Sequence, residues 1–324
     1  MSDSERVFLP FDEGLLELPE RGLYLRPSSD IPEIIPDMVY EQGFKPFADS
    51  LVARGFSVVA EAAGEFPMVF VGLTRSRVEN MANVARAARM GAVVVVSGAK
   101  TDGVDSLLKS VKKVCDIDGV LSKSHGKVFW FTPTVAFDWV LERSENSEGF
   151  VTAAGMFSPD KVDKGSALLT EYFDGSVKGS VADLGAGWGY LASEVLKRCE
   201  KVASVDLYEA EHSALEAAKL NVTDTRAAFH WTDVATMEKP SEGYHAVICN
   251  PPFHQGRAAE PSIGIGFIRA AARILRPSGQ LLMVANRQLP YEEALDLSFK
   301  HWEILHQDKA FKVVRARRPL PKRG

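Results

Sequence analysis

A short apolar strand that runs into a glycine turn constrains the fold of this chain more than any other feature. The segment reads Val181-Ala-Asp-Leu-Gly185-Ala-Gly187-Trp-Gly189, and residues 190–198 follow it with helical spacing. Glycines let a backbone approach a ligand closely, and the start of a helix offers backbone N–H groups. A strand, a glycine turn and a helix are the opening unit of an open α/β sheet, which binds ligands at the carboxyl ends of its strands. We therefore expect an α/β domain with a ligand at this turn.

Acidic residues stand near the ends of three successive expected strands. Asp183 lies two residues before the first glycine, where a carboxylate is awkward for a pyrophosphate but suits a ligand with an ammonium group, such as the methionine end of S-adenosylmethionine. Asp206 ends the expected strand 202–205, about where doubly wound folds bind ribose hydroxyls. Asp233 ends a third unit and could reach an adenine amino group. Each acid alone is more often a helix cap or a surface charge. Together they predict a cofactor site made of Asp183, Gly185, Ala186, Gly187, Gly189, Asp206 and Asp233.

A second motif, Asn250-Pro-Pro-Phe253, follows the apolar run 246–249, which reads as a buried parallel strand. The prolines fix φ and remove two donors, so the Asn250 side chain and the Pro251 carbonyl can accept from one planar amino group. Such an amine is a poor nucleophile, and holding both of its hydrogens can expose the nitrogen lone pair. Phe253 would stack on the ring that carries the amine. The alternative is a simple turn between strand and loop. We expect a catalytic group made of Asn250, Pro251, Pro252 and Phe253, with Asn250 also near the cofactor.

These motifs, with Gly155-Met-Phe-Ser158 and Val284-Ala-Asn-Arg-Gln-Leu-Pro-Tyr291, give the chain a family resemblance. It resembles the class I S-adenosylmethionine-dependent methyltransferases, and more narrowly the bacterial ribosomal RNA guanine-N2 methyltransferases of the RsmC type. The resemblance implies transfer of a methyl group to the exocyclic N2 of a guanine, with small-subunit 16S RNA as the expected substrate. A base edge inside a helix cannot reach the methyl donor, so the guanine must be unpaired or flipped out.

Three other functions remain open from the residues alone. An adenine-N6 or a protein-glutamine methyltransferase needs the same Asn-Pro-Pro-aromatic geometry for its amino or amide nitrogen. A non-catalytic RNA-binding assembly factor could keep the fold without the chemistry. His254 and Arg257 could both contact RNA, but we expect His254 to pack or hydrogen-bond and not to act as a base, because positioning should supply most of the rate. Residues 257–265 read as an insertion that overhangs the pocket.

The first half of the chain repeats the second in outline. A strand at 68–73, a helix at 77–89 and a strand at 92–97 precede a turn and another helix, but Leu73-Thr-Arg-Ser stands where Asn-Pro-Pro-Phe is expected. No Asp-x-Gly-x-Gly-x-Gly occurs before residue 68. We therefore predict two tandem Rossmann-like methyltransferase domains. Residues 1–145 form a degenerate copy that positions RNA or gives structural support, and residues 150–324 form the catalytic domain. The alternative is that any two α/β domains look alike at this level.

Composition and charge bear on the number of domains, the cell compartment and the binding partners. A chain of 324 residues with 46% hydrophobic content can build two domains, and its three cysteines have no metal or redox spacing. No signal peptide or membrane span is visible, and we expect a cytoplasmic monomer with no metal and no membrane. The resemblance implies ribosomal RNA or a ribosomal subunit as its partner. The net charge of −5 argues against a generally basic surface. From Lys309 onward, however, seven Lys or Arg occur without an acid, and we expect this tail to reach outward and contact phosphates. A solvated chain end is the alternative.

Overall fold

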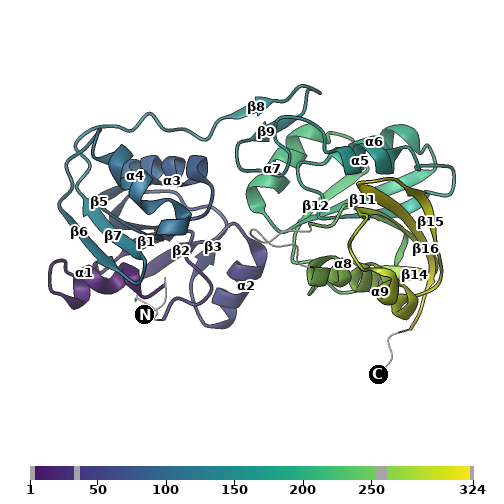
Figure 1. Cartoon of the computed structure of the whole chain (residues 1–324), viewed down its shortest axis with the longest axis horizontal. Coiled ribbons are helices and arrows are strands. Elements are labelled where there is room, and N and C mark those ends of the chain that lie inside the picture. Colours follow the sequence, from purple (N-terminus) through teal and green to yellow (C-terminus); the bar gives the residue numbers. More distant parts are fainter. Residues whose placement is uncertain (1–3, 33–36, 253–260, 322–324) are drawn as a thin grey trace. The chain divides into compact units, whose positions relative to one another are not determined.

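A computed structural model describes residues 4–32, 37–252 and 261–321. Its internal contacts divide the chain into two compact units (Figure 1). Unit 1 comprises residues 1–143 and 153–155, and unit 2 comprises residues 144–152 and 156–324. A two-stranded sheet of β8 (Arg143–Glu145) and β9 (Val151–Ala153) lies where the division falls. The assignment of separate roles to residues 1–145 and 150–324 stays a prediction.

Unit 2 is built on a seven-stranded sheet with the order β12-β11-β10-β13-β14-β16-β15. The first strand of this sheet in chain order, β10, lies inside the sheet. The five strands from β10 to β14 are parallel, so their carboxyl ends meet at one edge. The last strand is antiparallel to both of its neighbours. The strands are β10 (Gly179–Leu184), β11 (Val202–Glu209), β12 (Ala227–Trp231), β13 (Tyr244–Cys249), β14 (Leu275–Asn286), β15 (Phe299–Gln307) and β16 (Phe311–Pro319).

Helices cover both faces of this sheet, which explains why its central strands are continuously apolar. Along β13, Val247 and Cys249 belong to one buried cluster and Ala246 and Ile248 to the other, because successive side chains point to opposite faces. The first cluster packs against α8 and α9, and the second against α5, α6 and α7. These helices are α5 (Lys164–Thr170), α6 (Tyr190–Arg198), α7 (His212–Asn221), α8 (Pro261–Ile274) and α9 (Glu292–Ser298).

Unit 1 repeats this topology with the strand order β3-β2-β1-β4-β5-β7-β6, again with an antiparallel last strand inserted beside the fifth. The prediction of two tandem Rossmann-like domains is therefore confirmed. Its strands are β1 (Gly22–Leu25), β2 (Met38–Glu41), β3 (Val58–Val59), β4 (Phe66–Gly72), β5 (Gly91–Ala99), β6 (Gly119–Lys123) and β7 (Gly126–Phe131). Its helices are η1 (Arg6–Phe8), α1 (Leu9–Asp12), α2 (Lys45–Ala53), α3 (Arg77–Met90), η2 (Lys100–Asp102) and α4 (Val104–Val111).

Two expectations about local structure are wrong. The segment expected as an insertion is helical from Pro261 onward, because α8 begins there and its apolar face packs on the sheet. The basic segment is not an outward-reaching tail either. Most of it forms β16, which lies between β14 and β15; residues 312–314 near its start are buried, whereas Arg317 and Arg318 near its end are exposed. Residues 257–260 of the expected insertion and residues 322–324 lie outside the described structure.

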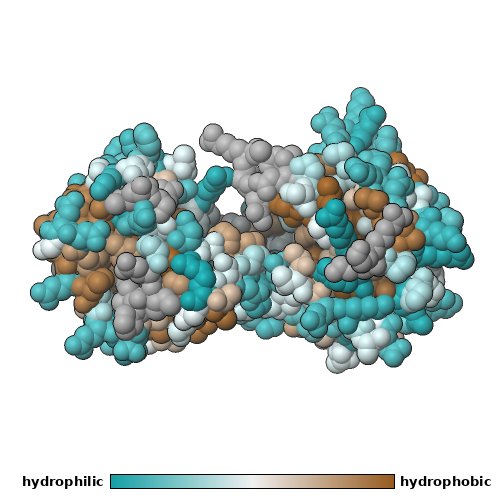
Figure 2. Space-filling model, turned by 90° about the horizontal axis from the view of Figure 1, so that it is seen from below, coloured by the Kyte–Doolittle hydropathy of each residue, from teal (hydrophilic) through white to brown (hydrophobic). Residues whose placement is uncertain are grey.

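The surface of both units mixes polar and apolar side chains on the face that Figure 2 shows. Exposed large apolar residues come from many different elements, as is usual for folded proteins. Among the described residues, every helix is too short or too polar to pass through a lipid bilayer.

Candidate functional site

The sheet of unit 2 brings the two sequence motifs side by side. Leu184 at the end of β10 is in register with Cys249 at the end of β13, and the strands are parallel neighbours. The glycine turn and Asn250 therefore leave the sheet at the same edge, one residue after this pair. Open α/β sheets bind their ligands at this edge. The fold thus places Asp183, the glycines and Asn250 within one candidate site.

All three glycines of the turn adopt backbone conformations that side chains disfavour. Gly185, Gly187 and Gly189 have φ of 69°, 55° and 91°. A Cβ at Gly189 would lie 2.8 Å from Val222, whereas a Cβ at Gly187 would meet no atom within 4 Å. Gly189 therefore lets α6 pack against α7, while Gly187 leaves open space beside its backbone. The Ala186 and Gly185 N–H groups donate to the Tyr208 carbonyl at 3.1 and 2.8 Å, which ties the turn to β11.

Asp183 is completely buried at the base of the turn. Its Oδ2 accepts from the Ala192 N–H at 3.0 Å, which fixes the start of α6 against the strand. Its Oδ1 is buried and has no hydrogen-bond partner among the described residues. Burial, and to a lesser extent the nearby charge of Glu209, raises the pKa of Asp183 to about 8. A buried carboxylate oxygen without a partner is costly, so the site lacks a donor or a cation at this point.

The expectation that Asp206 ends its strand is wrong. β11 continues to Glu209, so Asp206 lies inside the sheet, in register with Ala182 and Ala228. Its carboxylate is already engaged, because Oδ1 lies 2.7 Å from the His230 Nε2 and Oδ2 accepts from the Tyr244 hydroxyl at 2.9 Å. These contacts argue for a structural role of Asp206 in unit 2.

Glu209 occupies the strand end that was expected of Asp206. Its Oε2 accepts from the Gly187 N–H at 2.8 Å, and its Oε1 accepts from the Glu211 N–H at 2.7 Å. The carboxylate therefore lies against the glycine turn, and burial raises its pKa. The sequence analysis missed this residue because it took the strand to end at the first acid. Leu207 and Tyr208, which continue the apolar and aromatic run beyond Asp206, were the signal that the strand goes on.

The remaining predicted residues are placed only in part. Asp233 lies two residues beyond the end of β12, and its Oδ1 accepts from the Ala235 N–H at 2.8 Å, as in an Asx turn. Pro251 is buried and Pro252 is exposed. Phe253, His254 and Arg257 lie outside the described residues. The contact of Asp233 with a cofactor and the stacking role of Phe253 therefore stay predictions.

Asn250 is held by two side chains that the sequence analysis did not single out. Its Nδ2 donates to Asp163 Oδ2 and to Ser166 Oγ, both at 2.9 Å. Asp163 is the N-cap of α5, and the same Oδ2 accepts from the Ser166 N–H at 2.9 Å. The start of α5 thus lies directly against the motif that follows β13.

Among its described residues, unit 1 lacks counterparts of the two carboxylates and of the asparagine of this site. Both units can be aligned through the last paired residues of their first strands, Leu25 and Leu184, which take equivalent partners. The positions of Asp183, Glu209 and Asn250 then correspond to Tyr24, Gln42 and Gly72. The register thus places Gly72, one residue before Leu73, at the position of Asn250.

Local contacts support this alignment. The Phe44 N–H donates to Gln42 Oε1 at 2.9 Å, as the Glu211 N–H does to Glu209. A Cβ at Gly72 would lie only 2.4 Å from the Arg26 carbonyl oxygen, so no side chain fits there. The Arg26 guanidinium, paired with Glu79 at 2.5 Å, lies at this edge of unit 1. Among the described residues of unit 1, Arg26 occupies this edge with Glu79 and Gln42, and no equivalent of the cofactor site is present.

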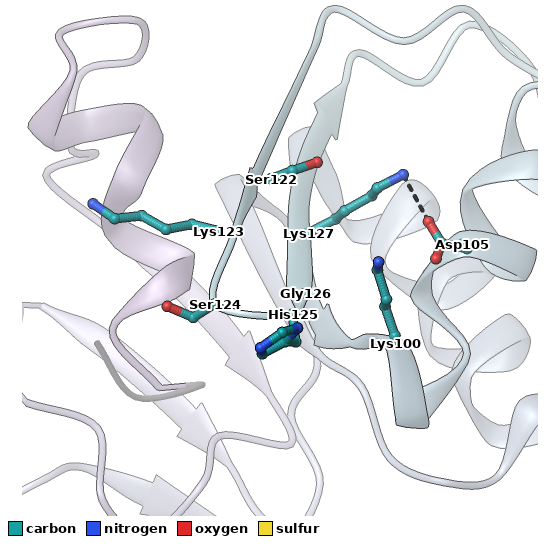
Figure 3. A pocket seen from close by; sticks show the side chains of 8 residues that line it. All are labelled: Lys100, Asp105, Ser122, Lys123, Ser124, His125, Gly126 and Lys127. Carbon is teal, nitrogen blue, oxygen red and sulfur yellow. Dashed lines mark ion pairs between the residues drawn. The ribbon is translucent and has the colours of Figure 1, made fainter.

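Unit 1 does contain a hollow of about 530 Å³ lined by lysines, serines and His125. Figure 3 shows that Lys127 points toward Asp105, with which it forms an ion pair at 2.6 Å, and that Lys123 points away from this pair. The lysines therefore do not converge on one point. No group of three or more His, Cys, Asp or Glu in the described ranges could hold a metal ion.

The fold and the site together define a class I methyltransferase domain joined to a second unit of the same topology. Residues 148–315 match the model of the methyltransferase small domain family. The chain is 32% identical over 243 residues to a ribosomal RNA small subunit methyltransferase C of Yersinia pseudotuberculosis, which covers 73% of this chain and 69% of that protein. It is 28% identical to the protein of the same name from Hahella chejuensis, covering 83% of this chain and 82% of that one.

A solved structure agrees with this assignment. The 16S rRNA N2 G1207 methyltransferase of T. thermophilus, in complex with AdoMet and guanosine, matches 97% of this chain and 91% of that chain with a TM-score of 0.80 at 21% identity. This structure shows the same fold, and the match of the family model over residues 148–315, more than half of the chain, shows that the chain belongs to the methyltransferase small domain family. The predicted enzyme class, an S-adenosylmethionine-dependent methyltransferase, is confirmed.

Proposed function

We propose that this enzyme transfers the methyl group of S-adenosylmethionine to the exocyclic N2 of a guanine in small-subunit ribosomal RNA. The observation that carries the proposal is Asn250 at the strand end beside the glycine turn, with its amide nitrogen occupied by Asp163 and Ser166. A carboxylate can only accept, so the Asn250 Oδ1 is the atom left to accept from a substrate amine. The names of the relatives, which cover most of this chain, support ribosomal RNA as the substrate.

The cofactor fits the residues that are present. The buried Asp183 Oδ1 without a partner suits a cationic ammonium group, and Glu209 at the turn suits ribose hydroxyls. Gly185, Ala186 and Gly187 supply backbone that a ligand can approach, and Asp233 stays the proposed contact for the adenine amino group. When bound, S-adenosylmethionine supplies an electrophilic methyl group. Asp206 is left out of this set, because its carboxylate is engaged inside the sheet.

The protein's own residues would then position the guanine. The Asn250 Oδ1 and the Pro251 carbonyl accept the two N2 hydrogens, the rigid Pro251-Pro252 pair keeps these acceptors in place, and Phe253 stacks on the base. The amine loses conjugation with the ring and its lone pair turns toward the methyl donor. Orientation of this kind can account for most of the rate, and the proton leaves to water after transfer.

We further propose that unit 1 positions RNA or supports unit 2 without binding cofactor, and that the enzyme is a monomer of the cytoplasm. The edge around Gly72 and Arg26 supports the absence of a second cofactor site.

Small ribosomal subunits from a strain that lacks the gene for this enzyme are the right substrate, because their target guanine is unmodified. The test is methyl transfer from labelled S-adenosylmethionine to such small subunits and to their naked RNA. Digestion to nucleosides and mass spectrometry should give N2-methylguanosine. Labelled N6-methyladenosine, or label in protein glutamine, would instead establish one of the alternative enzymes. Cofactor binding without transfer to any of these substrates would favour a non-catalytic assembly factor.

A further inference from the structure

The contacts around Asn250 point to a further functional element at the start of α5. We infer that Asp163, assisted by Ser166, is a positioning residue that holds the Asn250 amide with its oxygen toward the substrate and strengthens that oxygen as an acceptor. This inference rests on the proposed function, because it assigns a role in the same methyl transfer. Asp163 acts through Asn250 and is not proposed to touch the substrate.

Orientation is the first part of the argument. An asparagine amide can turn over and present either its oxygen or its nitrogen to a ligand. Asp163 Oδ2 and Ser166 Oγ both lie 2.9 Å from the Asn250 Nδ2. The carboxylate has no proton to donate, so it binds only the NH₂ end of the amide. The turned-over amide would place its oxygen against a carboxylate, which is repulsive.

Electrostatics is the second part. An N–H that donates to a carboxylate makes a stronger bond than one that donates to a neutral group. Hydrogen bonds in a chain polarise one another, so drawing on the NH₂ end increases the negative charge on the amide oxygen. A more negative Oδ1 is a better acceptor for the target amine. It also favours the positive charge that builds up on the amine as it attacks a methyl group.

The neighbouring residues of α5 and β16 hold Asp163 in this place. Its Oδ2 also accepts from the Ser166 N–H, so the N-cap of α5 fixes the carboxylate relative to the helix. Ser166 is buried. Gly165 completes the arrangement, because a Cβ there would lie 3.0 Å from Asp163 Oδ2 and 3.1 Å from the Phe311 ring. In the sequence, Asp163-Lys-Gly-Ser166 looks like an ordinary helix start. The fold brings it into contact with Asn250, which lies 87 residues further along the chain.

The test compares Asp163→Asn with Asp160→Asn in the full-length enzyme. Asparagine is as good an N-cap as aspartate, so Asp163→Asn keeps α5 capped and removes only the charge. Asp160 is exposed, and its side chain forms no hydrogen bond or ion pair with another described residue, so Asp160→Asn removes a nearby charge without altering the hydrogen bonds of Asn250. We expect Asp163→Asn to lower kcat about tenfold, with unchanged cofactor affinity and thermal stability. Asp160→Asn should match the parent.

A second readout does not depend on activity. The side-chain NH₂ of Asn250, identified in nitrogen-15 spectra by its loss in Asn250→Ala, should shift in Asp163→Asn and in Ser166→Ala but not in Asp160→Asn. An unshifted Asn250 signal, or parent-like kcat in Asp163→Asn, would overturn the inference. A shifted signal in a protein whose parent methylates no RNA would support the contact while the proposed function fails, so the two failures can be told apart.

Discussion

Asp183 makes a quantitative prediction, because its carboxyl group is buried and one of its oxygens has no partner. With a pKa of about 8, roughly nine-tenths of the ligand-free enzyme carries the proton on Asp183 at pH 7. If the ammonium group of the cofactor binds only to ionised Asp183, the large protonated fraction of the enzyme lowers the apparent affinity for the cofactor. The affinity for S-adenosylhomocysteine, which keeps the ammonium group, should therefore rise about tenfold per pH unit from pH 6 and level off near pH 8.

The assay is isothermal titration calorimetry at several pH values and in buffers of different ionisation enthalpy. The parent enzyme should release nearly one proton per ligand bound at pH 7, whereas Asp183→Asn should release none through this group. The variant keeps an acceptor for the Ala192 N–H, so α6 should remain in place. Because the ligand titrates equally in both experiments, the ratio of the two affinities isolates Asp183. Parallel pH profiles for parent and variant would refute the reasoning.

The same pKa has a consequence for stability without ligand. Between the unfolded value near 4 and the folded value of about 8, the folded state keeps a proton that the unfolded state has lost. The stability contributed by this proton is therefore fully present below pH 4 and declines as the pH rises through 8. Thermal unfolding of the ligand-free parent should show this decline relative to Asp183→Asn.

Three further predictions address the other parts of the site. Asn250→Ala should lower kcat by about a hundredfold or more while the affinity for S-adenosylhomocysteine stays within a few-fold, and calorimetry that shows lost binding would contradict this role. Glu209→Gln should weaken cofactor binding about tenfold. The matched change Asp206→Asn should lower the melting temperature and leave affinity alone, and the reverse result would restore Asp206 as the ribose ligand. Titration of the full-length chain should give one cofactor per chain, whereas two would mean that unit 1 has kept a site.

The sequence was sufficient for the features that local chemistry determines. Strands at 68–73 and 246–249 and the glycine turn follow from apolar runs and from the conformational freedom of glycine, and the structure has β4, β13 and three left-handed glycines there. It was not sufficient where the length of an element decides the outcome. Taking β11 to end three residues early placed Asp206 at the strand end and left Glu209 out of the predicted site, because an acid inside a strand and an acid at its end look the same in one dimension.

Contacts between distant segments were the other limit. Asp163 precedes Asn250 by 87 residues, and nothing in the composition of either segment links them. The link arises because α5 packs against the β14–β16 side of the sheet, which brings its N-cap to the end of β13. Functional groups that position other groups are therefore harder to find from sequence than those that carry a motif.

The basic segment near the end of the chain was also misjudged, because its contacts are with segments that are distant in sequence. Comparison of the two units explains the ion pair that Lys312 forms. Lys312 on β16 is in register with Ala285, and Lys127 on β7 is in register with Gly98, which are equivalent positions in the two units. Lys312 pairs with Glu292 at 2.5 Å, and Lys127 pairs with Asp105 at 2.6 Å. Each acid lies in the first turn of the helix that follows the fifth strand. The same ion pair thus recurs in both units, which is the pattern expected of a structural contact.

Lys312 and the exposed pair Arg317 and Arg318 should consequently respond differently to neutralisation. Lys312→Met removes a buried cation that donates to the Leu289 carbonyl and to Glu292, so it should cost about 1–2 kcal/mol of unfolding free energy without altering the salt dependence of RNA binding. Changing Arg317 and Arg318 to glutamine should leave stability intact and lower the slope of log affinity against log salt by about 1.4, because each phosphate contact to a single strand contributes about 0.7. The choice of guanine should not change, since phosphate contacts carry no sequence information. An unchanged slope in the double variant would mean that Arg317 and Arg318 do not contact RNA phosphates.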